Sequence, residues 1–70
     1  MAETVSVKVN GEARAVPRGA TLLEVLATFA LDPRSVVVEH NRRIVRRPAL
    51  GDVCVAPGDA IELVHFVGGG

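Results

Sequence analysis

Residues 21–33 carry the pattern of one short amphipathic helix, and the segments on both sides of it have the alternation or the apolar runs of β-strands. Thr21 and Glu24 match a capping box, in which the Thr21 hydroxyl accepts a hydrogen bond from the Glu24 amide while the Glu24 carboxylate reaches back. The helix is predicted to begin at Leu22 and to end at Asp32-Pro33, because proline disfavours helical geometry in the residue before it. One apolar stripe is formed by Leu22, Val25, Leu26 and Phe29. This stripe is predicted to lie against a β-sheet.

The first hairpin is predicted from alternating valines followed by a turn signal. Valines at positions 5, 7 and 9 alternate with polar residues, which places them on one face of a strand. Asn10-Gly11 then gives a strong signal for a hairpin turn. A two-residue turn would set the charged side chains of Glu12 and Arg14 opposite the valines. A three-residue turn sets Ala13 and Ala15 there instead, so the pattern favours the longer turn.

The rest of the chain predicts a sheet that the helix can cover. Further strands are expected at residues 36–39, 44–45, 53–55 and 60–67, with an irregular stretch over 47–52. This order of elements is typical of an α+β fold, with a mixed four- to five-stranded sheet and one main helix packed on one face. A chain of 70 residues supports one small core, so residues 1–67 are expected to form a single domain.

The last predicted strand has an unusual solvent face. Residues 61, 63, 65 and 67 share one face, and Glu62, Val64 and Phe66 share the other. Glu62 indicates that the second face is exposed to solvent. Val64 and Phe66 are therefore apolar residues on the solvent side, which indicates a contact surface next to the end of the chain.

Charge and composition exclude several classes of protein. Eight Lys and Arg balance eight Asp and Glu, and the chain has two Phe but no Trp or Tyr. Binding to nucleic acid is therefore not expected, because both the basic excess and the stacking rings are lacking. The start of the chain has no secretory signal pattern, and no segment approaches the roughly 20 apolar residues of a membrane span. We expect a cytoplasmic protein without a membrane partner.

The chain offers few groups for metal or acid–base chemistry. A single cysteine cannot form an internal disulfide, and no Cys/His group has the spacing of metal ligands. Cys54 stands between two valines and is expected to be a small buried apolar residue. His40 and His65 have no nucleophile or carboxylate placed beside them by sequence. We expect no metal site and no catalytic residue.

The three glycines at positions 68–70 are the remaining candidate for function. They form an arm of roughly 10 Å when extended, and without side chains it can enter a narrow slot in another protein. A free carboxylate at Gly70 is a poor electrophile until ATP converts it to an acyl-adenylate. A sulfur donor would then leave a thiocarboxylate, and an amine would leave an isopeptide bond. On this hypothesis the chain is a substrate or carrier rather than an enzyme; a frayed terminus is the alternative.

The order of several short stretches resembles the ThiS family, the sulfur carriers of thiamine biosynthesis, which have the β-grasp or ubiquitin-like fold. The resemblance covers nearly the whole chain. The stretches that carry it are Val9-Asn10-Gly11-Glu12, Gly19-Ala20-Thr21-Leu22-Leu23-Glu24-Val25-Leu26, Val38-Glu39-His40-Asn41, Ile44-Val45-Arg46-Arg47, Gly58-Asp59-Ala60-Ile61-Glu62 and Phe66-Val67-Gly68-Gly69-Gly70. The resemblance implies a β-grasp domain with a glycine tail.

The resemblance also implies a cycle of loading and unloading. An E1-like adenylating enzyme would use ATP to activate Gly70, with Gly69 as its required neighbour and Gly68 extending the arm. A sulfur donor such as a cysteine desulfurase would supply the sulfur, and thiazole synthase would consume the thiocarboxylate. The face that leads to the tail, formed by Val64, Phe66 and Val67, would dock these partners. No cofactor would be bound by the chain itself.

Three other hypotheses remain open. A molybdopterin-synthase small subunit would use the same tail chemistry for another partner. A ubiquitin-like modifier would end in an isopeptide bond with a target lysine. A plain β-grasp interaction module would not use its tail at all. The arginines at positions 42, 43, 46 and 47 are interpreted as charges that protect a strand edge, with an acidic partner surface as the alternative.

Overall fold

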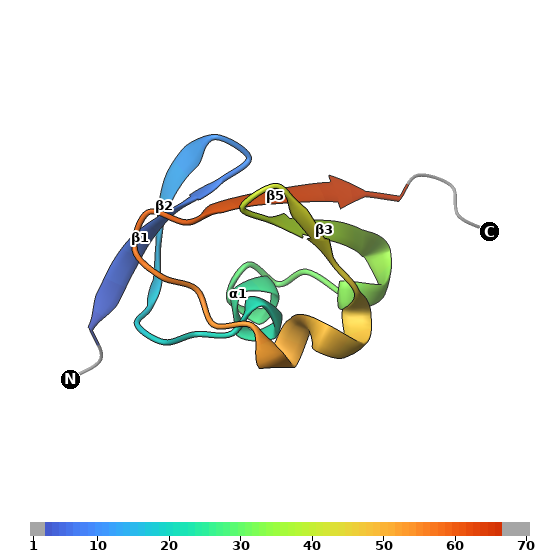
Figure 1. Ribbon diagram of the computed structural model, residues 1–70, viewed down its shortest axis with the longest axis horizontal. Helices are drawn as coiled ribbons and strands as arrows, with labels where there is room; N and C mark the ends of the chain where they lie inside the picture. Colours follow the sequence, from blue (N-terminus) through green and yellow to red (C-terminus); the bar gives the residue numbers. More distant parts are fainter. Residues whose placement is uncertain (1–2, 67–70) are drawn as a thin grey trace.

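The computed structural model describes residues 3–66 and arranges five strands in one sheet (Figure 1). The elements are β1 (Thr4–Val9), β2 (Glu12–Pro17), α1 (Leu22–Thr28), the 3-10 helix η1 (Pro33–Ser35), β3 (Val36–His40), β4 (Arg43–Val45), the 3-10 helix η2 (Arg47–Asp52) and β5 (Ala60–His65). The strand order is β2-β1-β5-β3-β4. The central β1–β5 pair is parallel and the other pairs are antiparallel. The α+β class and the mixed sheet are thus confirmed.

Helix α1 starts as predicted and ends earlier. The Glu24 amide donates to Thr21 Oγ1 at 3.1 Å and the Thr21 amide donates to Glu24 Oε1 at 2.8 Å, which completes the capping box. The helix stops at Thr28, because Ala30 takes a left-handed conformation with φ of 58°. The prediction that Asp32-Pro33 ends the helix is wrong. Asp32 instead caps η1 by accepting a hydrogen bond from the Arg34 amide.

The first hairpin has the shorter turn, so the prediction of a three-residue turn is wrong. Val9 pairs with Glu12 and Val7 pairs with Arg14. Asn10 and Gly11 form the turn alone, with φ values of 50° and 84°. Positive φ at both central positions is the geometry of a type I′ turn, whose twist matches that of a hairpin.

The charged residues of β2 tolerate this register because β2 lies at the edge of the sheet. Glu12 and Arg14 remain largely exposed, and the Arg14 guanidinium lies 3.2 Å from Glu12 Oε1. The same guanidinium covers the ring of Phe29 at 5.7 Å from its centroid. Only Val16 of β2 is buried. An edge strand can therefore face the helix side without burying its charges.

The segment from residue 47 to 55 differs from the sequence expectation in three ways. Arg47–Asp52 is a 3-10 helix rather than an irregular stretch, and its Leu50 is fully buried. Residues 53–55 form no strand; Cys54 makes one isolated bridge with Thr21. Cys54 is exposed, which contradicts the expectation of burial. Val53 and Val55 take the inward positions on either side, so alternation turns Cys54 outward.

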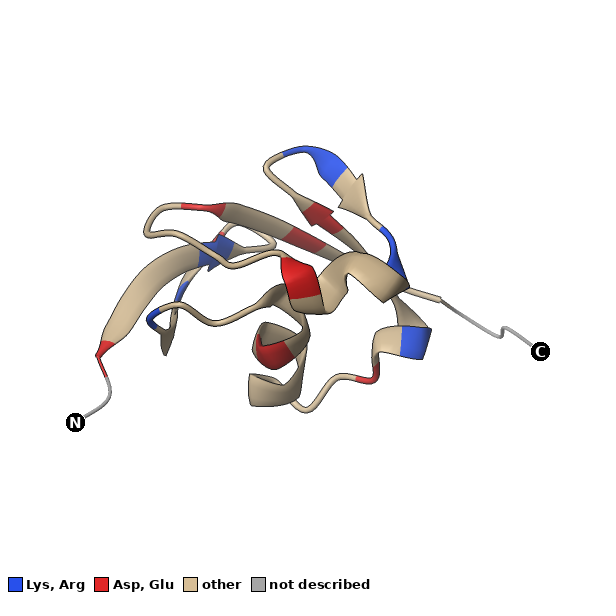
Figure 2. Ribbon diagram, turned by 60° about the horizontal axis from the view of Figure 1, so that its bottom comes forward, with Lys and Arg blue, Asp and Glu red and all other residues tan. Residues whose placement is uncertain are grey.

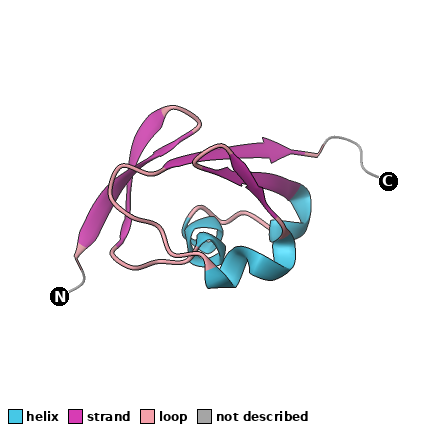
Figure 3. Ribbon diagram, viewed as in Figure 1, coloured by secondary structure: helices cyan, strands magenta, loops and turns pink. Residues whose placement is uncertain are grey.

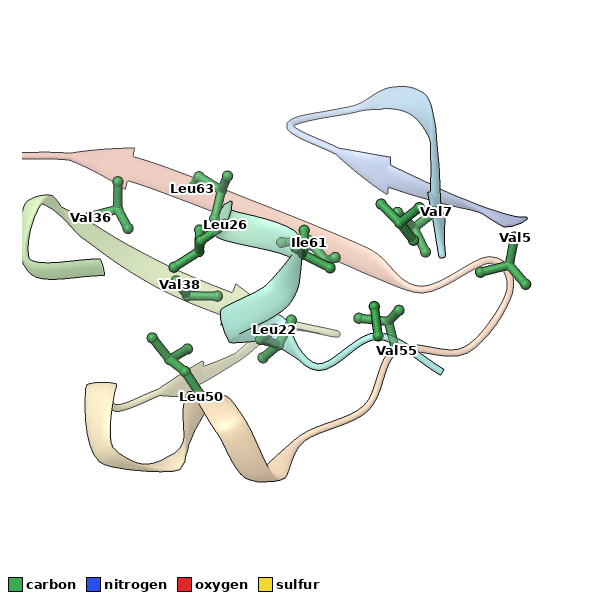
Figure 4. Close-up of a cluster of buried hydrophobic side chains, with 13 residues drawn as sticks. Val5, Val7, Leu22, Leu26, Val36, Val38, Leu50, Val55, Ile61 and Leu63 are labelled. Atoms are coloured by element: carbon green, nitrogen blue, oxygen red, sulfur yellow. The ribbon is translucent and has the colours of Figure 1, made fainter. Parts of the chain in front are cut away.

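The core lies between the inner face of the sheet and the layer formed by α1 and η2 (Figures 3 and 4). The helices lie on one side of the strands, as Figure 3 shows. The buried side chains are Val5, Val7, Val16, Ala20, Leu22, Val25, Leu26, Val36, Val38, Leu50, Val55, Ile61 and Leu63. None of the helices in the described residues 3–66 has the length and apolar character of a membrane span.

Candidate functional site

The root of the glycine tail is fixed by the central strand of the sheet. β5 lies between β1 and β3 and pairs with β3 from His40↔Ile61 to Val36↔His65. Beyond this ladder, the Phe66 amide donates to the Ser35 carbonyl at 2.9 Å. The path of the chain is therefore held as far as Phe66. Val67, Gly68, Gly69 and Gly70 lie outside the described residues.

The outer face of the sheet next to this root is apolar. Val64 and Phe66 expose 56% and 59% of their surface, which confirms their predicted outward position. Val37 lies beside Val64 across the β3–β5 ladder, and Ile44 on β4 is 66% exposed. Sequence reasoning missed Ile44. The available signal was alternation: Ile44 directly precedes Val45, which faces inward, so Ile44 must face outward. The docking role assigned to Val64, Phe66 and Val67 stays a prediction.

Four of the arginines lie in two groups, one at each end of β4, and blue segments also occur elsewhere in Figure 2. One group is the β3–β4 turn, where Arg42 and Arg43 are exposed. The other is the connection from β4 to η2, where Arg46 and Arg47 are exposed. β4 is an edge strand of the sheet, as the edge-protection interpretation requires.

A polar cluster that sequence reasoning missed lies at the start of β5. His40 Nε2 lies 2.6 Å from Asp59 Oδ2, and both side chains are more than four-fifths buried. Asp59 Oδ2 also accepts from the Ala56 amide at 2.8 Å, and Asp59 Oδ1 accepts from Asn41 Nδ2 at 3.3 Å. Asn41 Oδ1 accepts from the Ala60 amide at 2.9 Å. The cluster therefore joins the β3–β4 turn to the turn that precedes β5.

The charge on Asp59 is stabilised by this cluster. Burial alone would raise the pKa of the carboxyl group, but hydrogen bonds from Ala56, His40 and Asn41 outweigh it and hold the pKa below its usual range. The sequence gives only a weak signal for the contact between His40 and Asp59, because each of them stands beside a different turn. Among residues 3–66, no group of three His, Cys, Asp or Glu side chains could hold a metal ion.

The topology places the chain in the β-grasp, or ubiquitin-like, class. A hairpin, a helix that crosses the sheet, and a last strand inserted between β1 and β3 are the features of this class, and here they bring β5 to an exposed apolar face. The sequence profile of the ThiS family matches residues 7–70. The chain belongs to the ThiS family.

Individual proteins agree with this assignment. The sulfur carrier protein ThiS of Bacillus subtilis is 40% identical over 50 residues, which cover 71% of this chain and 76% of that protein. The crystal structure of a thiamine biosynthesis protein (ThiS) from Geobacter metallireducens superposes with a TM-score of 0.81 at 30% identity, covering 94% of this chain and 100% of that one.

Two longer proteins also contain a similar segment. A thiazole synthase of Magnetococcus marinus is 38% identical over 66 residues, which cover 94% of this chain and 20% of the synthase. A thiazole synthase of Paramagnetospirillum magneticum is 39% identical over 62 residues, which cover 89% of this chain and 19% of the synthase. The chain thus spans about a fifth of the length of these relatives.

Proposed function

We propose that this chain is the sulfur carrier of thiamine biosynthesis and that Gly70 carries the sulfur. The observation that carries the proposal is the match to the ThiS family, which extends through the glycines to residue 70. The similarity to the Bacillus subtilis sulfur carrier supports it. The fold adds a fixed strand that leads to the tail and an exposed apolar face beside it.

The chemistry follows from the reactivity of a carboxylate. Attack of the Gly70 carboxylate on ATP forms an acyl-adenylate and releases pyrophosphate. A sulfide equivalent then attacks the acyl carbon, the bond to AMP breaks, and a thiocarboxylate remains. The sulfur of the thiocarboxylate attacks an electrophilic carbon of the thiazole precursor and forms a carbon–sulfur bond. An oxygen nucleophile such as water then cleaves the acyl–sulfur bond, which leaves the sulfur on the precursor and restores the Gly70 carboxylate. In this cycle the carrier is a substrate of its partners and not itself an enzyme, and ATP is bound by the adenylating partner.

Three partners follow from this cycle. Thiazole synthase is the consumer of sulfur, and two thiazole synthases that contain a segment similar to this chain support that choice. An E1-like adenylating enzyme is needed to activate Gly70. A sulfur donor such as a cysteine desulfurase supplies the sulfur as a persulfide, and a thiol reductant releases it at the sulfide level. We place the cycle in the cytoplasm, where ATP is available.

Mass spectrometry of the C-terminal peptide tests the proposal directly. The protein is co-expressed with an E1-like adenylating enzyme and a cysteine desulfurase, and its C-terminal peptide is isolated. We expect a mass increase equal to the replacement of one oxygen by sulfur. Deletion of Gly70 abolishes the increase, and so does one residue appended after Gly70, while both variants keep the fold. An unchanged mass for the wild-type chain under sulfur-replete conditions would contradict the proposal.

A further inference from the structure

A groove of about 480 Å³ lies beside the end of β5, at the root of the tail. Its apolar lining includes Val37, Ile44 and Phe66, and its basic lining consists of Arg34, Arg46 and Arg47. Phe66 is the last described residue before the glycines, so the groove lies at the end of the described part of the chain. Exposed Ile44 and Phe66 make it a site where an apolar side chain of another protein could be buried.

The charges around this groove are unbalanced. Arg34 is paired with Asp32, whose Oδ2 lies 2.8 Å from Arg34 Nη2. The hydrogen bonds from Arg34 lower the pKa of the Asp32 carboxyl group to about 2, so this pair is neutral overall. Arg46 and Arg47 are exposed and make no ion pair within residues 3–66. The groove therefore carries two positive charges that an incoming partner can meet.

The outer face of the sheet is graded along β5. Glu39 and Glu62 oppose each other on β3 and β5, with Ile44 beside Glu39 on β4, and the apolar pair Val37 and Val64 follows two residues nearer the tail. Phe66 and the arginines of the groove come next. Figure 2 shows the red segments on the central strands and the blue segment before η2 close to the C-terminal end. A partner that aligns with this gradient must place its own negative charge near the tail.

We propose that this groove docks a segment of thiazole synthase in which an apolar side chain is flanked by acidic residues. The inference rests on the proposed function and names the chemistry of one of its partners. Burial of the apolar side chain against Ile44 and Phe66 supplies affinity, and carboxylates paired with Arg46 and Arg47 set the orientation. An extended three-glycine arm spans about 10 Å, so a partner held here has the tip of the tail within reach.

Charge complementarity favours a protein segment over other anions. The formal net charge of the chain is zero, with eight basic and eight acidic residues. Nucleic acids and anionic membranes bind through broad basic surfaces, and the carboxylates of Glu39 and Glu62 would repel either of them on this face. A short acidic and apolar peptide segment fits both the size of the groove and its two unpaired charges.

The test compares two double substitutions that change the net charge equally. R46E/R47E reverses the charge at the groove, and R42E/R43E reverses it at the β3–β4 turn on the same edge strand. Binding of each purified chain to thiazole synthase is measured by titration calorimetry at low and at high salt. We expect R46E/R47E to weaken binding by on the order of tenfold at low salt, with a smaller difference at high salt. R42E/R43E is expected to stay within about threefold of the wild type, because exposed charges away from a contact contribute little.

A second pair of variants tests the apolar lining. Ile44→Ser removes an exposed side chain from the groove, and Leu23→Ser removes one that is 43% exposed on α1. We expect Ile44→Ser to weaken binding by on the order of tenfold and Leu23→Ser to leave it unchanged. Equal losses from both arginine pairs, or unchanged binding of both R46E/R47E and Ile44→Ser, would overturn the inference.

Sulfur loading of the same samples separates this inference from the proposed function. If the wild-type chain gains no sulfur with the adenylating enzyme and the desulfurase, the proposed function fails whatever the binding data show. If it gains sulfur and R46E/R47E still binds thiazole synthase like the wild type, only the groove inference fails. Loss of loading in R46E/R47E with normal binding to the synthase also overturns it, because the groove would then serve the adenylating enzyme.

Discussion

Asp59 and His40 are 19 residues apart in sequence, and their side chains meet at 2.6 Å where β5 begins. Asp59 accepts three hydrogen bonds, from Ala56, His40 and Asn41, and so connects two turns through one carboxylate. The pair lies at the start of the strand whose other end leads to the tail. Its effect on function is therefore indirect: it stabilises the strand that presents the tail.

Acid is expected to destabilise the protein through Asp59. In the folded chain the pKa of Asp59 is held below its usual range. Burial alone would raise this pKa, but the hydrogen bonds to the carboxylate outweigh burial. Since the unfolded pKa is about 3.9, the stabilisation is fully present above about pH 5 and is lost as the pH falls through the folded pKa. We expect Asp59→Asn to lose about 1 to 3 kcal/mol at neutral pH and to show a flatter decline on acidification. Urea unfolding from pH 7 to pH 3 measures both effects.

Asp32→Asn is the matched control for this experiment. Asp32 also has a lowered pKa, of about 2, through its hydrogen bonds with Arg34, but the pair lies on the surface. The contribution of Asp32 to the pH dependence of stability should disappear at high salt, whereas the contribution of Asp59 should persist. Identical pH profiles for Asp59→Asn and the wild type would mean that the cluster does not stabilise the fold.

The Asn10 side chain is expected to stabilise the sheet just beyond the end of the β1–β5 ladder. Asn10 Oδ1 accepts from the Leu63 amide at 2.7 Å, and Asn10 Nδ2 donates to the Leu63 carbonyl at 3.3 Å. The Cα pairing of β1 with β5 stops at Val9↔Ile61, so the amide side chain continues it. Asn10→Gly keeps the positive φ of the turn and removes these bonds, at an expected cost of about 1 to 2 kcal/mol.

Comparison of Asn10→Ala with Asn10→Gly separates the contribution of the turn conformation from that of the side-chain hydrogen bonds. Alanine loses the same contacts and also strains a residue whose φ is 50°, so its cost should exceed that of Asn10→Gly by about 1 kcal/mol. Urea midpoints of the two variants and the wild type give both differences. A glycine variant as stable as the wild type would show that the side-chain bonds contribute nothing.

The features that local patterns predicted correctly are those decided by neighbours in sequence. The capping box of Thr21 and Glu24 depends on residues three apart, and it forms as expected. The outward position of Val64 and Phe66 follows from alternation along one strand, with Glu62 as the reference. Both arguments needed no knowledge of the rest of the fold.

The features that were missed depend on where an element lies in the sheet. The register of the first hairpin was predicted on the assumption that charge at Arg14 would be buried, and the edge position of β2 removes that penalty. Cys54 has apolar neighbours in sequence, but only the fold decides which residues face inward. The contact between His40 and Asp59 joins two turns that only the sheet topology brings together.

Relief of strain at Arg42 is expected to stabilise the protein. Arg42 occupies the second position of the tight turn between β3 and β4 with a φ of 72°, a conformation that favours glycine. Arg42→Gly removes a strain of about 1 to 2 kcal/mol but adds unfolded-state entropy, so we expect a net gain of about 0.5 to 1 kcal/mol. Arg43→Gly, inside β4, should be destabilising. Thermal midpoints of the two variants check the difference, and a lower midpoint for Arg42→Gly would contradict it.

Substitutions at Leu50 and Ile44 should affect different properties: the first the stability of the domain, the second the binding of its partner. Leu50 on η2 is 1% exposed within the core, whereas Ile44 is 66% exposed at the groove. Leu50→Ala should cost about 2 to 5 kcal/mol, a large part of the roughly 4 to 10 kcal/mol expected for a domain of this size. Ile44→Ala should change stability by less than about 1 kcal/mol, because its side chain is already in contact with water.

Urea unfolding and amide hydrogen exchange measure this contrast. Leu50→Ala should speed exchange throughout the sheet, including the β5 amides that lead to the tail, because the whole domain opens more often. Ile44→Ala should keep wild-type exchange in β5 and lose only partner binding. If Leu50→Ala left exchange in β5 unchanged, η2 would be a separate unit, and β5 would be held by the sheet and α1 without it.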